Sequence, residues 1–441
     1  MRTATADPLR VTLVAWLEEF RLRTRRLLAP LTDDDLERQH DPIMSPLIWD
    51  VGHVANFEEL WLLREVGGRR PIDARLDAVY NPFDNPRSVR ADLDILRRTE
   101  AFEYLDDVRA SALSVMRAVA FDPARPLVRD GYVWSMVAQH EAQHQETMLQ
   151  ALDLRGDLPP YEPALGRVVA RPRAVDDTER VAIPAGPFDQ GTDDTAHAYD
   201  NERPTWRVDL GAFAIDRFPV SARRYADFID RGGYDREEWW SPHGWAWRNE
   251  TGHRMPQGWS PASRGGWLVR RFGSVFPLDP VEIVEHVSYW EAEAFCASVG
   301  GRLPTESEWE KAARWDPAAR RSRRYPWGDE APAADRANLD HRAFGPSTVG
   351  AYPLGASAYG VEQMIGDVYE WTASTFSPYP GYATFPYPEY SEVFFGDDYR
   401  VLRGASWATG SLVARPTFRN WDYPQRRQIF AGIRVAYDRP A

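Results

Sequence analysis

The sequence has little of several features that define whole classes of protein. Of its 441 residues one is a cysteine, Cys296, which excludes an intramolecular disulfide framework and any four-cysteine metal site. No run of about 18 apolar residues occurs, so no membrane-spanning helix is expected. The opening stretch MRTATADPLR is polar and does not resemble a secretory signal. We therefore expect a cytoplasmic protein from a reducing compartment.

Positive charge is scarce relative to negative charge. The chain has 53 Lys and Arg residues against 66 Asp and Glu residues, a net charge of −13, and Lys311 is its single lysine. The many arginines suit bidentate recognition of carboxylates, although a GC-rich genome produces the same bias without a functional reason. Nucleic acids and anionic membranes attract proteins with a clustered positive field. The charge therefore argues against both as partners.

Tryptophan and glycine divide the chain into two parts. Residues 1–174 hold 4 of the 18 tryptophans and 6 of the 30 glycines, and the length suggests two or three domains. We predict a helical domain over residues 1–157, a linker rich in Pro, Gly and charge over 158–179, and a second domain over 180–441. We also expect a monomer.

The N-terminal part shows helical periodicity. Apolar residues recur on one face of a first helix: Leu13, Trp16, Leu17, Phe20 and Leu27. Ser45 and Pro46 provide an N-cap and a first-turn proline for a second helix through IWDVGHVANFEELWLLREV. Further helices are predicted over 99–120 and 132–154. Four helices joined by loops predict a four-helix bundle.

The C-terminal part predicts an irregular α+β domain with long packed loops, because short β-prone runs alternate with many Gly, Pro and Trp residues. The expected strands are 180–184, 206–218, 400–402 and 432–436, and the expected helices are 222–230 and 288–299.

Two histidines four residues apart give the first chemical signal. His140 and His144 lie in WSMVAQHEAQHQETMLQAL, so a helix would place both imidazoles on one face, about one turn apart. Metal ligands have this spacing, although a solvent-exposed or helix-packing pair has it too. Apolar neighbours such as Met136 and Leu149 favour a metal, because unpaired buried imidazoles would be costly.

A third ligand must come from another element. His53, in the middle of the second predicted helix, is the best candidate because bundles build metal sites from facing helices; the alternative is a buried polar residue without a ligand role. Glu146 lies two residues past His144, roughly 200° around the helix, and should not join the same coordination face. Three histidines without a carboxylate or thiolate suit catalytic zinc and non-haem iron alike.

Several motifs resemble known families. SPLIWDVGHVANFEELWLLRE and HEAQHQETMLQAL resemble the DinB-type helical domain. The second part resembles the formylglycine-generating-enzyme fold, a C-type-lectin-like architecture, in the motifs IPAGPFDQG, DNERP, GGRLPTESEWEKAAR, GDVYEWT, RVLRGASW and RNWDYPQRRQIFAGIRVA. The two in tandem cover nearly the whole chain, and their order is similar to the ergothioneine-biosynthesis sulfoxide synthases.

The resemblance implies an oxidative coupling of a thiol, γ-glutamylcysteine, to C2 of the imidazole of hercynine (Nα-trimethylhistidine), with oxygenation of the sulfur to a sulfoxide. It implies O2 as co-substrate and Fe(II) as the metal on His53, His140 and His144, since zinc does not activate dioxygen. A structural Ca2+ in the second domain is a further possibility.

Substrate-binding residues can be assigned where motifs match. Arg87 and Arg90 lie three apart near a helix start, so both guanidinium groups can point the same way and grip carboxylates, although a surface pair has the same spacing. The resemblance implies that Asp422 binds the α-ammonium group of the thiol and Arg426 a further carboxylate. Around hercynine it places Gln143 and Asn420 at the carboxylate and Trp421 at the trimethylammonium group, where cation–π attraction competes with a plain core role.

The resemblance also implies a catalytic tyrosine. Its distance ahead of RVLRG identifies Tyr387, with Tyr382 and Tyr390 as competitors because the loop length varies in this segment. A phenol near the metal can donate a proton and so favour sulfoxide formation with C–S coupling over simple dioxygenation of the thiol.

Other function classes fit less of the sequence. A formylglycine-generating oxidase shares the second fold, but its chemistry resembles a copper-dependent mechanism that needs a pair of cysteines. A DinB-type thiol S-transferase would not explain the second part of the chain, and a lectin-like binding module would not explain the three histidines. The nearest alternative is a sibling enzyme that uses free cysteine, or histidine in place of hercynine as in ovothiol synthesis. The arginines together with Asp422 favour a thiol with two carboxylates.

Overall fold

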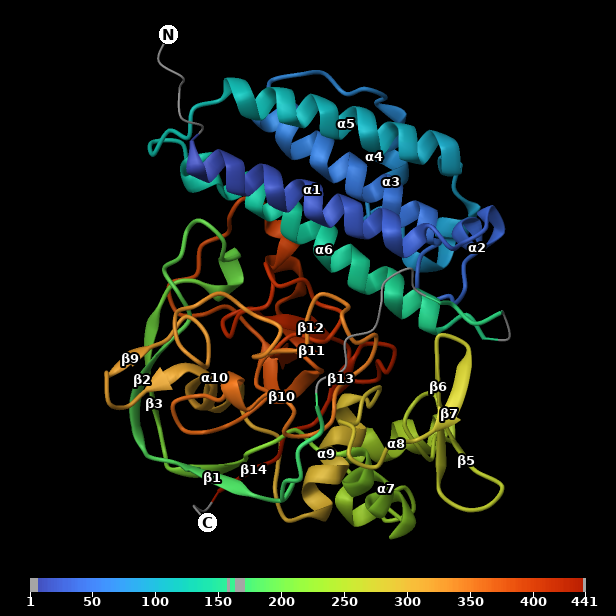
Figure 1. The fold of residues 1–441 in the computed structure, drawn as a ribbon, viewed down its shortest axis with the longest axis vertical. Coiled ribbons are helices and arrows are strands. Elements are labelled where there is room, and N and C mark those ends of the chain that lie inside the picture. The colour runs from blue at the N-terminus through green and yellow to red at the C-terminus, as the bar shows by residue number, and fades with distance from the viewer. Residues whose placement is uncertain (1–6, 157–158, 163–170, 439–441) are drawn as a thin grey trace. The chain divides into compact units, whose positions relative to one another are not determined.

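The computed structural model describes residues 7–156, 159–162 and 171–438 (Figure 1). The chain forms two compact units, one of residues 1–166 with 194–197 and the other of residues 167–193 with 198–441. The predicted linker is only partly covered, because residues 158 and 163–170 lie outside the described part. Among the described residues, no helix is long and apolar enough to cross a membrane.

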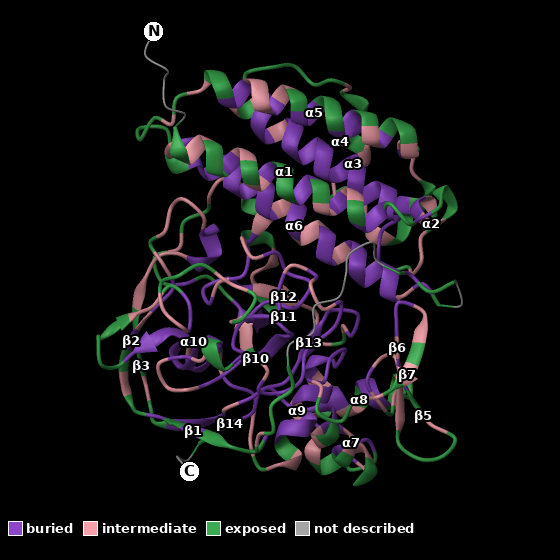
Figure 2. Ribbon diagram, in the orientation of Figure 1, coloured by how far each residue is buried: buried purple, intermediate pink, exposed green. Residues whose placement is uncertain are grey.

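The first unit is a bundle of helices. Its long members are α1 (Pro8–Leu28), α3 (Leu47–Glu58), α5 (Arg98–Ala118) and α6 (Tyr132–Asp153), with α3 packed against α5 and α6, and α1 against α6. Figure 2 shows α3 and α6 buried along most of their length, as central helices of a bundle should be. The helices predicted over 99–120 and 132–154 are confirmed as α5 and α6.

Shorter helical elements connect the long ones, and the sequence did not predict them. They are α2 (Asp33–Glu37), the π-helical η1 (Glu59–Val66), α4 (Arg75–Tyr80), η2 (Arg87–Asp92) and η3 (Arg129–Gly131). Since η1 follows α3 without a break, the second predicted helix changes from α to π geometry at Glu59.

The start of α3 differs from the prediction. Pro46 occupies the N-cap position and no side chain caps the helix, so Ser45 is not the cap and Pro46 is not in the first turn. The Ser45 hydroxyl instead accepts a hydrogen bond from Nη1 of the buried Arg90 at 2.7 Å. The Ser45 hydroxyl thus bonds to this guanidinium group and not to the helix end.

Four buried charges bind the long helices together. Glu58 at the end of α3 contacts Arg21 at 2.8 Å and Arg109 at 2.7 Å. Glu141 on α6 contacts the same two arginines at 2.9 and 3.1 Å. All four side chains are at most 6 % exposed. Because each carboxylate meets both guanidinium groups, the buried charges compensate one another.

Removing one carboxylate from this quartet should weaken the fold strongly. We expect Glu58→Gln to lower the free energy of unfolding by about 3–5 kcal/mol, because Arg21 and Arg109 then share a single buried carboxylate. Urea unfolding followed by circular dichroism measures the change. Glu19→Gln, which breaks a pair with Arg23 in which Glu19 is 55 % exposed, is the control and should cost less than about 1 kcal/mol. Equal losses for the two variants would contradict the expectation.

The second unit contains two main sheets with irregular connections. One has the order β1 (Arg180–Ile183), β4 (Phe213–Asp216), β14 (Ala436–Tyr437). The other has the order β12 (Asn420–Asp422), β11 (Gly396–Arg403), β10 (Tyr369–Phe376), β13 (Ala431–Gly432). All pairings are antiparallel except β10 with β13.

Smaller elements surround these sheets. The remaining strands are β2 (Gly186–Gln190), β3 (Trp206–Leu210), β5 (Trp259–Pro261), β6 (Trp267–Arg271), β7 (Ser274–Pro277), β8 (Trp315–Asp316) and β9 (Arg321–Ser322). The α-helices are α7 (Ala222–Asp230), α8 (Pro242–Thr251), α9 (Tyr289–Ser298) and α10 (Glu306–Arg314). Single 3-10 turns are η4 (Asp200–Glu202), η5 (Glu237–Trp239), η6 (Pro353–Gly355), η7 (Pro388–Tyr390) and η8 (Glu392–Phe394).

The predicted elements of this unit are partly confirmed. The helices expected over 222–230 and 288–299 are α7 and α9, and the run 206–218 splits into β3 and β4, which belong to different sheets. The strand expected over 432–436 is wrong in its middle, where the chain passes from one main sheet to the other. There Arg434 is fully buried, with Nε 2.9 Å from Glu370 and Nη2 2.9 Å from the carbonyl of Glu362.

Candidate metal centre and substrate residues

The three predicted metal ligands come from two helices. His53 lies in the middle of α3, and His140 and His144 lie one turn apart on α6. One ligand atom of each ring lies within 4.8 Å of those of the other two, and the Nε2 atoms of His53 and His140 are 3.2 Å apart. The fold therefore brings together the three histidines that the sequence singled out.

No second group of three His, Cys, Asp or Glu side chains with ligand spacing occurs within residues 7–156, 159–162 and 171–438.

Hydrogen bonds on the far side of two rings fix which nitrogen faces the centre. Nδ1 of His53 is 2.8 Å from the carbonyl oxygen of Tyr80; a carbonyl only accepts, so Nδ1 carries the proton and Nε2 keeps its lone pair. Nδ1 of His144 is 3.0 Å from Oδ1 of Asp50, a carboxylate that is 1 % exposed. Such outer partners orient metal-bound imidazoles and raise their basicity.

Aromatic rings restrict the imidazoles from the side. The Trp49 ring stacks on His53 with centroids 4.9 Å apart, and the Phe57 ring stacks on His140 at 3.7 Å. The guanidinium carbon of Arg90 lies 3.7 Å from the centroid of Trp49, a cation–π distance. Rotation of either imidazole out of the centre would break these stacks.

Tyr80 reaches His53 because residue 52 is glycine. A Cβ atom at Gly52 would lie 2.1 Å from Cζ of Tyr80, so any other residue would push the tyrosine away. The hydroxyl of Tyr80 in turn accepts a hydrogen bond from the backbone N–H of Leu96 at 3.0 Å. The small residue one position ahead of His53 thus determines the partner of its Nδ1.

The environment favours neutral imidazoles. Burial lowers the pKa of His53 and of His140 well below the usual value, and the neighbouring His144 acts in the same direction. Neutral imidazole is the form that binds a metal. His53 is buried whereas His140 and His144 are half-buried, so one side of the centre stays accessible to ligands. The donor set therefore fits a divalent ion with open positions.

The two predicted arginines of the first unit donate to different backbone carbonyls. Nη1 of Arg87 donates to the carbonyl of Ile43 at 3.0 Å, whereas Nε of the buried Arg90 donates to the carbonyl of Asn85 at 2.9 Å. Burial lowers the pKa of Arg90 to about 10. The contact of Arg90 with Trp49 also makes it part of the wall behind His53. A grip of both arginines on one carboxylate stays a prediction.

Gln143 lies between the two histidines of α6, three residues after His140, so it shares that face of the helix. Its half-buried amide donates to the backbone carbonyl of Gln139 at 3.3 Å.

Three predicted substrate residues of the second unit form strand β12. Asn420, Trp421 and Asp422 pair with Leu402, Val401 and Arg400 of β11. Alternation along a strand places Asn420 and Asp422 on one side and Trp421 on the other. Oδ1 of Asp422 is 3.7 Å from Nε of Arg426, and both side chains are 22 % exposed. A half-buried carboxylate beside a half-buried guanidinium group can bind the ammonium and carboxylate groups of an amino acid together.

Trp421 belongs to an aromatic cluster. Its ring stacks on Phe376 at 4.1 Å and meets Phe394 and Tyr390 at 5.5 and 5.9 Å. These contacts match the core role that competed with cation–π binding; a contact with trimethylammonium stays a prediction.

The three candidate tyrosines differ in their contacts. The hydroxyl of Tyr382 donates to Oδ2 of Asp200 at 2.9 Å, and the ring of Tyr390 stacks on Tyr199 at 4.1 Å. Tyr387 is the half-buried residue that precedes η7, and its ring meets Tyr390 edge to face at 6.2 Å.

Sequence reasoning missed the residues that support the centre, Trp49, Asp50, Gly52, Phe57 and Tyr80. Asp50 carried a usable signal, since it precedes His53 by three residues on one helix face. Tyr80 carried none, because it acts through its backbone carbonyl.

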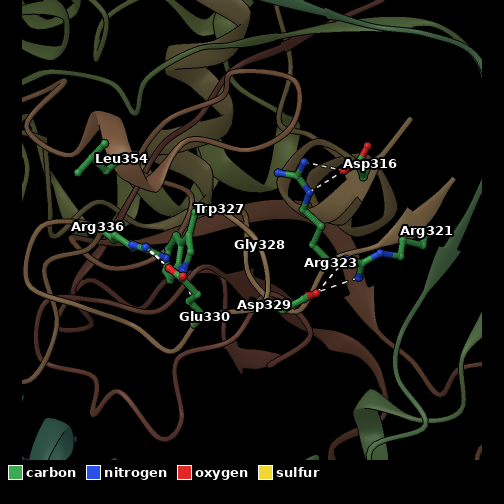
Figure 3. Close-up of a pocket in the computed structure, with 9 residues that line it drawn as sticks. All are labelled: Asp316, Arg321, Arg323, Trp327, Gly328, Asp329, Glu330, Arg336 and Leu354. Carbon is green, nitrogen blue, oxygen red and sulfur yellow. Dashed lines mark hydrogen bonds and ion pairs between the residues drawn. The ribbon is translucent and has the colours of Figure 1, made fainter. Parts of the chain in front are cut away.

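The second unit also has a surface pocket of about 490 Å³ near β8 and β9 (Figure 3). Its charged side chains bind one another: Arg323 contacts Asp316 at 2.6 Å, Arg321 contacts Asp329 at 2.8 Å, and Arg336 pairs with Glu330. Its charges are thus compensated by protein groups, and none of the predicted site residues lines it.

Two family models match the chain. The DinB superfamily model matches residues 17–148, and the model described as sulfatase-modifying factor enzyme 1-like domain matches residues 166–439. The predicted fold class, a DinB-like helical bundle with a C-terminal α+β domain of the formylglycine-generating-enzyme type, is therefore confirmed.

Curated relatives extend over both parts. The chain is similar to a hercynine oxygenase from Mycolicibacterium thermoresistibile, with 48 % identity over 99 % of this chain and 97 % of that protein. It is similar to a hercynine oxygenase from Mycolicibacterium smegmatis, with 46 % identity over 97 % and 99 %. A formylglycine-generating enzyme from Thermomonospora curvata is 33 % identical over 45 % of this chain and 71 % of its own length.

Proposed function

We propose, from the premise that this chain belongs to the hercynine oxygenase family, that it couples γ-glutamylcysteine to C2 of the hercynine imidazole and converts the sulfur to a sulfoxide. Membership makes it an O2-dependent oxidoreductase that oxidises hercynine; the thiol and the metal are the proposed parts. The observation that carries the proposal is the convergence of His53, His140 and His144 in a chain whose full-length relatives are oxygenases.

The reaction balances without an external reductant. Replacing a C–H and an S–H bond by one C–S bond removes two electrons, and forming the S–O bond of the sulfoxide removes two more. O2 accepts these four electrons; one oxygen atom enters the sulfoxide, and the other leaves as water with the two hydrogens.

His53, His140 and His144 would hold Fe(II), which would supply the activation of O2. The chain's own contribution is to keep the donors in place. Tyr80 and Asp50 hold the Nδ1 protons of His53 and His144 away from the metal, so both Nε2 lone pairs remain available.

The charged residues support γ-glutamylcysteine as the thiol. This dipeptide carries one ammonium group and two carboxylates, whereas cysteine has a single carboxylate. Asp422 suits the ammonium group, and Arg426 beside it suits a carboxylate. Arg87 and Arg90 lie in the unit that holds the histidines, and they suit a further carboxylate. Gln143, Asn420 and Trp421 are assigned to hercynine.

Tyr387 is the proposed proton donor. A proton delivered to the oxygen that is being reduced favours coupling to hercynine over dioxygenation of the thiol, in which both oxygen atoms end on sulfur.

Separate reactions with the two thiols test which of them is the substrate. The protein is loaded with Fe(II) under anaerobic conditions, mixed with hercynine and either γ-glutamylcysteine or cysteine, and exposed to O2, and the products are identified by mass spectrometry. We expect kcat/KM to be about 10–100-fold higher for γ-glutamylcysteine, since one extra charge-assisted contact contributes about 1.5–3 kcal/mol. Arg426→Gln should reduce this preference. Equal or better turnover of cysteine would assign the chain to the cysteine-using siblings.

A further inference from the structure

The DNERP motif contains a buried carboxylate that the proposed reaction does not use. Asp200 begins η4 and is 1 % exposed. It accepts hydrogen bonds from the hydroxyl of Ser391 at 2.5 Å, the hydroxyl of Tyr382 at 2.9 Å and the backbone N–H of Phe385 at 3.2 Å. Burial of a carboxylate costs free energy, and these three hydrogen bonds offset part of that cost. A carboxylate held in this way has a role in the structure or in the site.

All three partners lie in one segment, 382–391, and they enclose Tyr387. Tyr382 and Phe385 precede the tyrosine by five and two residues, and Ser391 follows it by four. The segment contains only the short turn η7 as regular structure, and its bonds to Asp200 come from three of its residues. One carboxylate therefore bonds to residues on both sides of Tyr387, Tyr382 and Phe385 before it and Ser391 after it; we call these two stretches the arms of the segment.

The next two residues of the motif extend this arrangement. Nδ2 of Asn201 donates to the same Ser391 hydroxyl at 2.9 Å. Oε2 of Glu202 accepts from Thr417 at 2.7 Å and from Nε of Arg415 at 2.8 Å, three and five residues ahead of strand β12. The motif thus ties the tyrosine segment to the chain that leads into Asn420 and Asp422.

We propose that Asp200 is a positioning residue for the oxygenation reaction: by holding both arms of segment 382–391 it keeps the hydroxyl of Tyr387 where it donates its proton. The inference rests on the role proposed above for Tyr387. It predicts that loss of the carboxylate alters the division of products more than it alters substrate binding.

Paired variants test this. With hercynine and γ-glutamylcysteine, Asp200→Ala should raise the ratio of sulfinate to sulfoxide at least about tenfold, while the KM for hercynine changes less than about twofold. Asp200→Asn should recover most of the sulfoxide, since its amide oxygen can accept from Phe385 and Tyr382 and its amide nitrogen can donate to Ser391. Asp230→Ala, at an exposed residue of α7, is the matched control. An unchanged product ratio in Asp200→Ala overturns the inference.

Two further measurements keep the test sharp. Ser391→Ala removes one of the three bonds; it should shift the ratio in the same direction by a smaller factor, and it replaces Asp200→Ala if that variant does not fold. In the double variant Asp200→Ala with Tyr387→Phe, the ratio should equal that of Tyr387→Phe alone, because both changes act through one hydroxyl. Additive shifts would overturn the inference.

The variants also separate this inference from the proposed function. A shift in Tyr387→Phe without a shift in Asp200→Ala rejects the positioning role and leaves the proton donor in place. A sulfoxide yield unaltered in Tyr387→Phe rejects the donor, and with it the role of Asp200.

Discussion

Replacing His140 with alanine should abolish O2 consumption in the presence of hercynine and thiol. In the proposed centre, only the nitrogens of His53 and His144 would remain as protein ligands, so we expect less iron per chain and turnover below about 1 % of the parent protein. Removing a partner that only orients a ligand already costs about 10–100-fold in comparable sites. Oxygen-electrode traces and the iron content of the desalted protein measure both effects.

Two further variants define the size of this effect. His243→Ala, at an exposed residue of α8, should retain iron and activity. This result would show that the loss of activity in His140→Ala is specific to the proposed ligand. Asp50→Asn keeps an oxygen for Nδ1 of His144 but removes the charge. Its O2 consumption should lie between those of His140→Ala and His243→Ala. Unchanged turnover in His140→Ala would refute the metal assignment.

Replacing Tyr387 with phenylalanine should redirect the reaction from sulfoxide to sulfinate. If Tyr387 is the donor, coupling without the phenol loses a contribution of typically about 10²–10⁴-fold, whereas dioxygenation of the thiol needs no proton from the protein. We expect O2 uptake to continue with γ-glutamylcysteine sulfinate as the main product. Mass spectrometry after a fixed amount of O2 is consumed measures the two products.

The competing tyrosines provide the controls. Tyr390→Phe keeps the ring that stacks on Tyr199, and sulfoxide should remain its main product. Tyr382→Phe removes one bond to Asp200 and should shift the products only slightly. If one of these variants produced sulfinate while Tyr387→Phe did not, that residue would be the donor.

The histidine cluster was predictable because its geometry is local or follows from the bundle. His140 and His144 share a face by helical spacing alone, and His53 follows from the need for a facing helix. The contacts that orient the rings were not predictable. Tyr80 lies 27 residues from His53 and contributes a backbone atom, which the identity of its side chain does not report.

The second unit was less predictable because its short strands depend on distant partners. β12 has three residues and exists through its pairing with β11. Residues 432–436 have the composition of a strand, yet Arg434 is drawn into the interior by Glu370 and backbone carbonyls. The aromatic surroundings of Trp421 likewise involve Phe376 and Phe394, which are remote in sequence.

A centre made of three imidazoles has no intrinsic preference for iron. The three donors include neither a thiolate nor a carboxylate. The affinities of divalent ions for such a site follow their general order, in which Co2+, Ni2+, Cu2+ and Zn2+ all bind more tightly than Fe2+. Metal supply during synthesis of the chain would therefore decide what fraction of molecules can turn over. The specific activity of a preparation would then depend on the fraction of chains that hold iron as much as on the turnover of each iron-loaded chain.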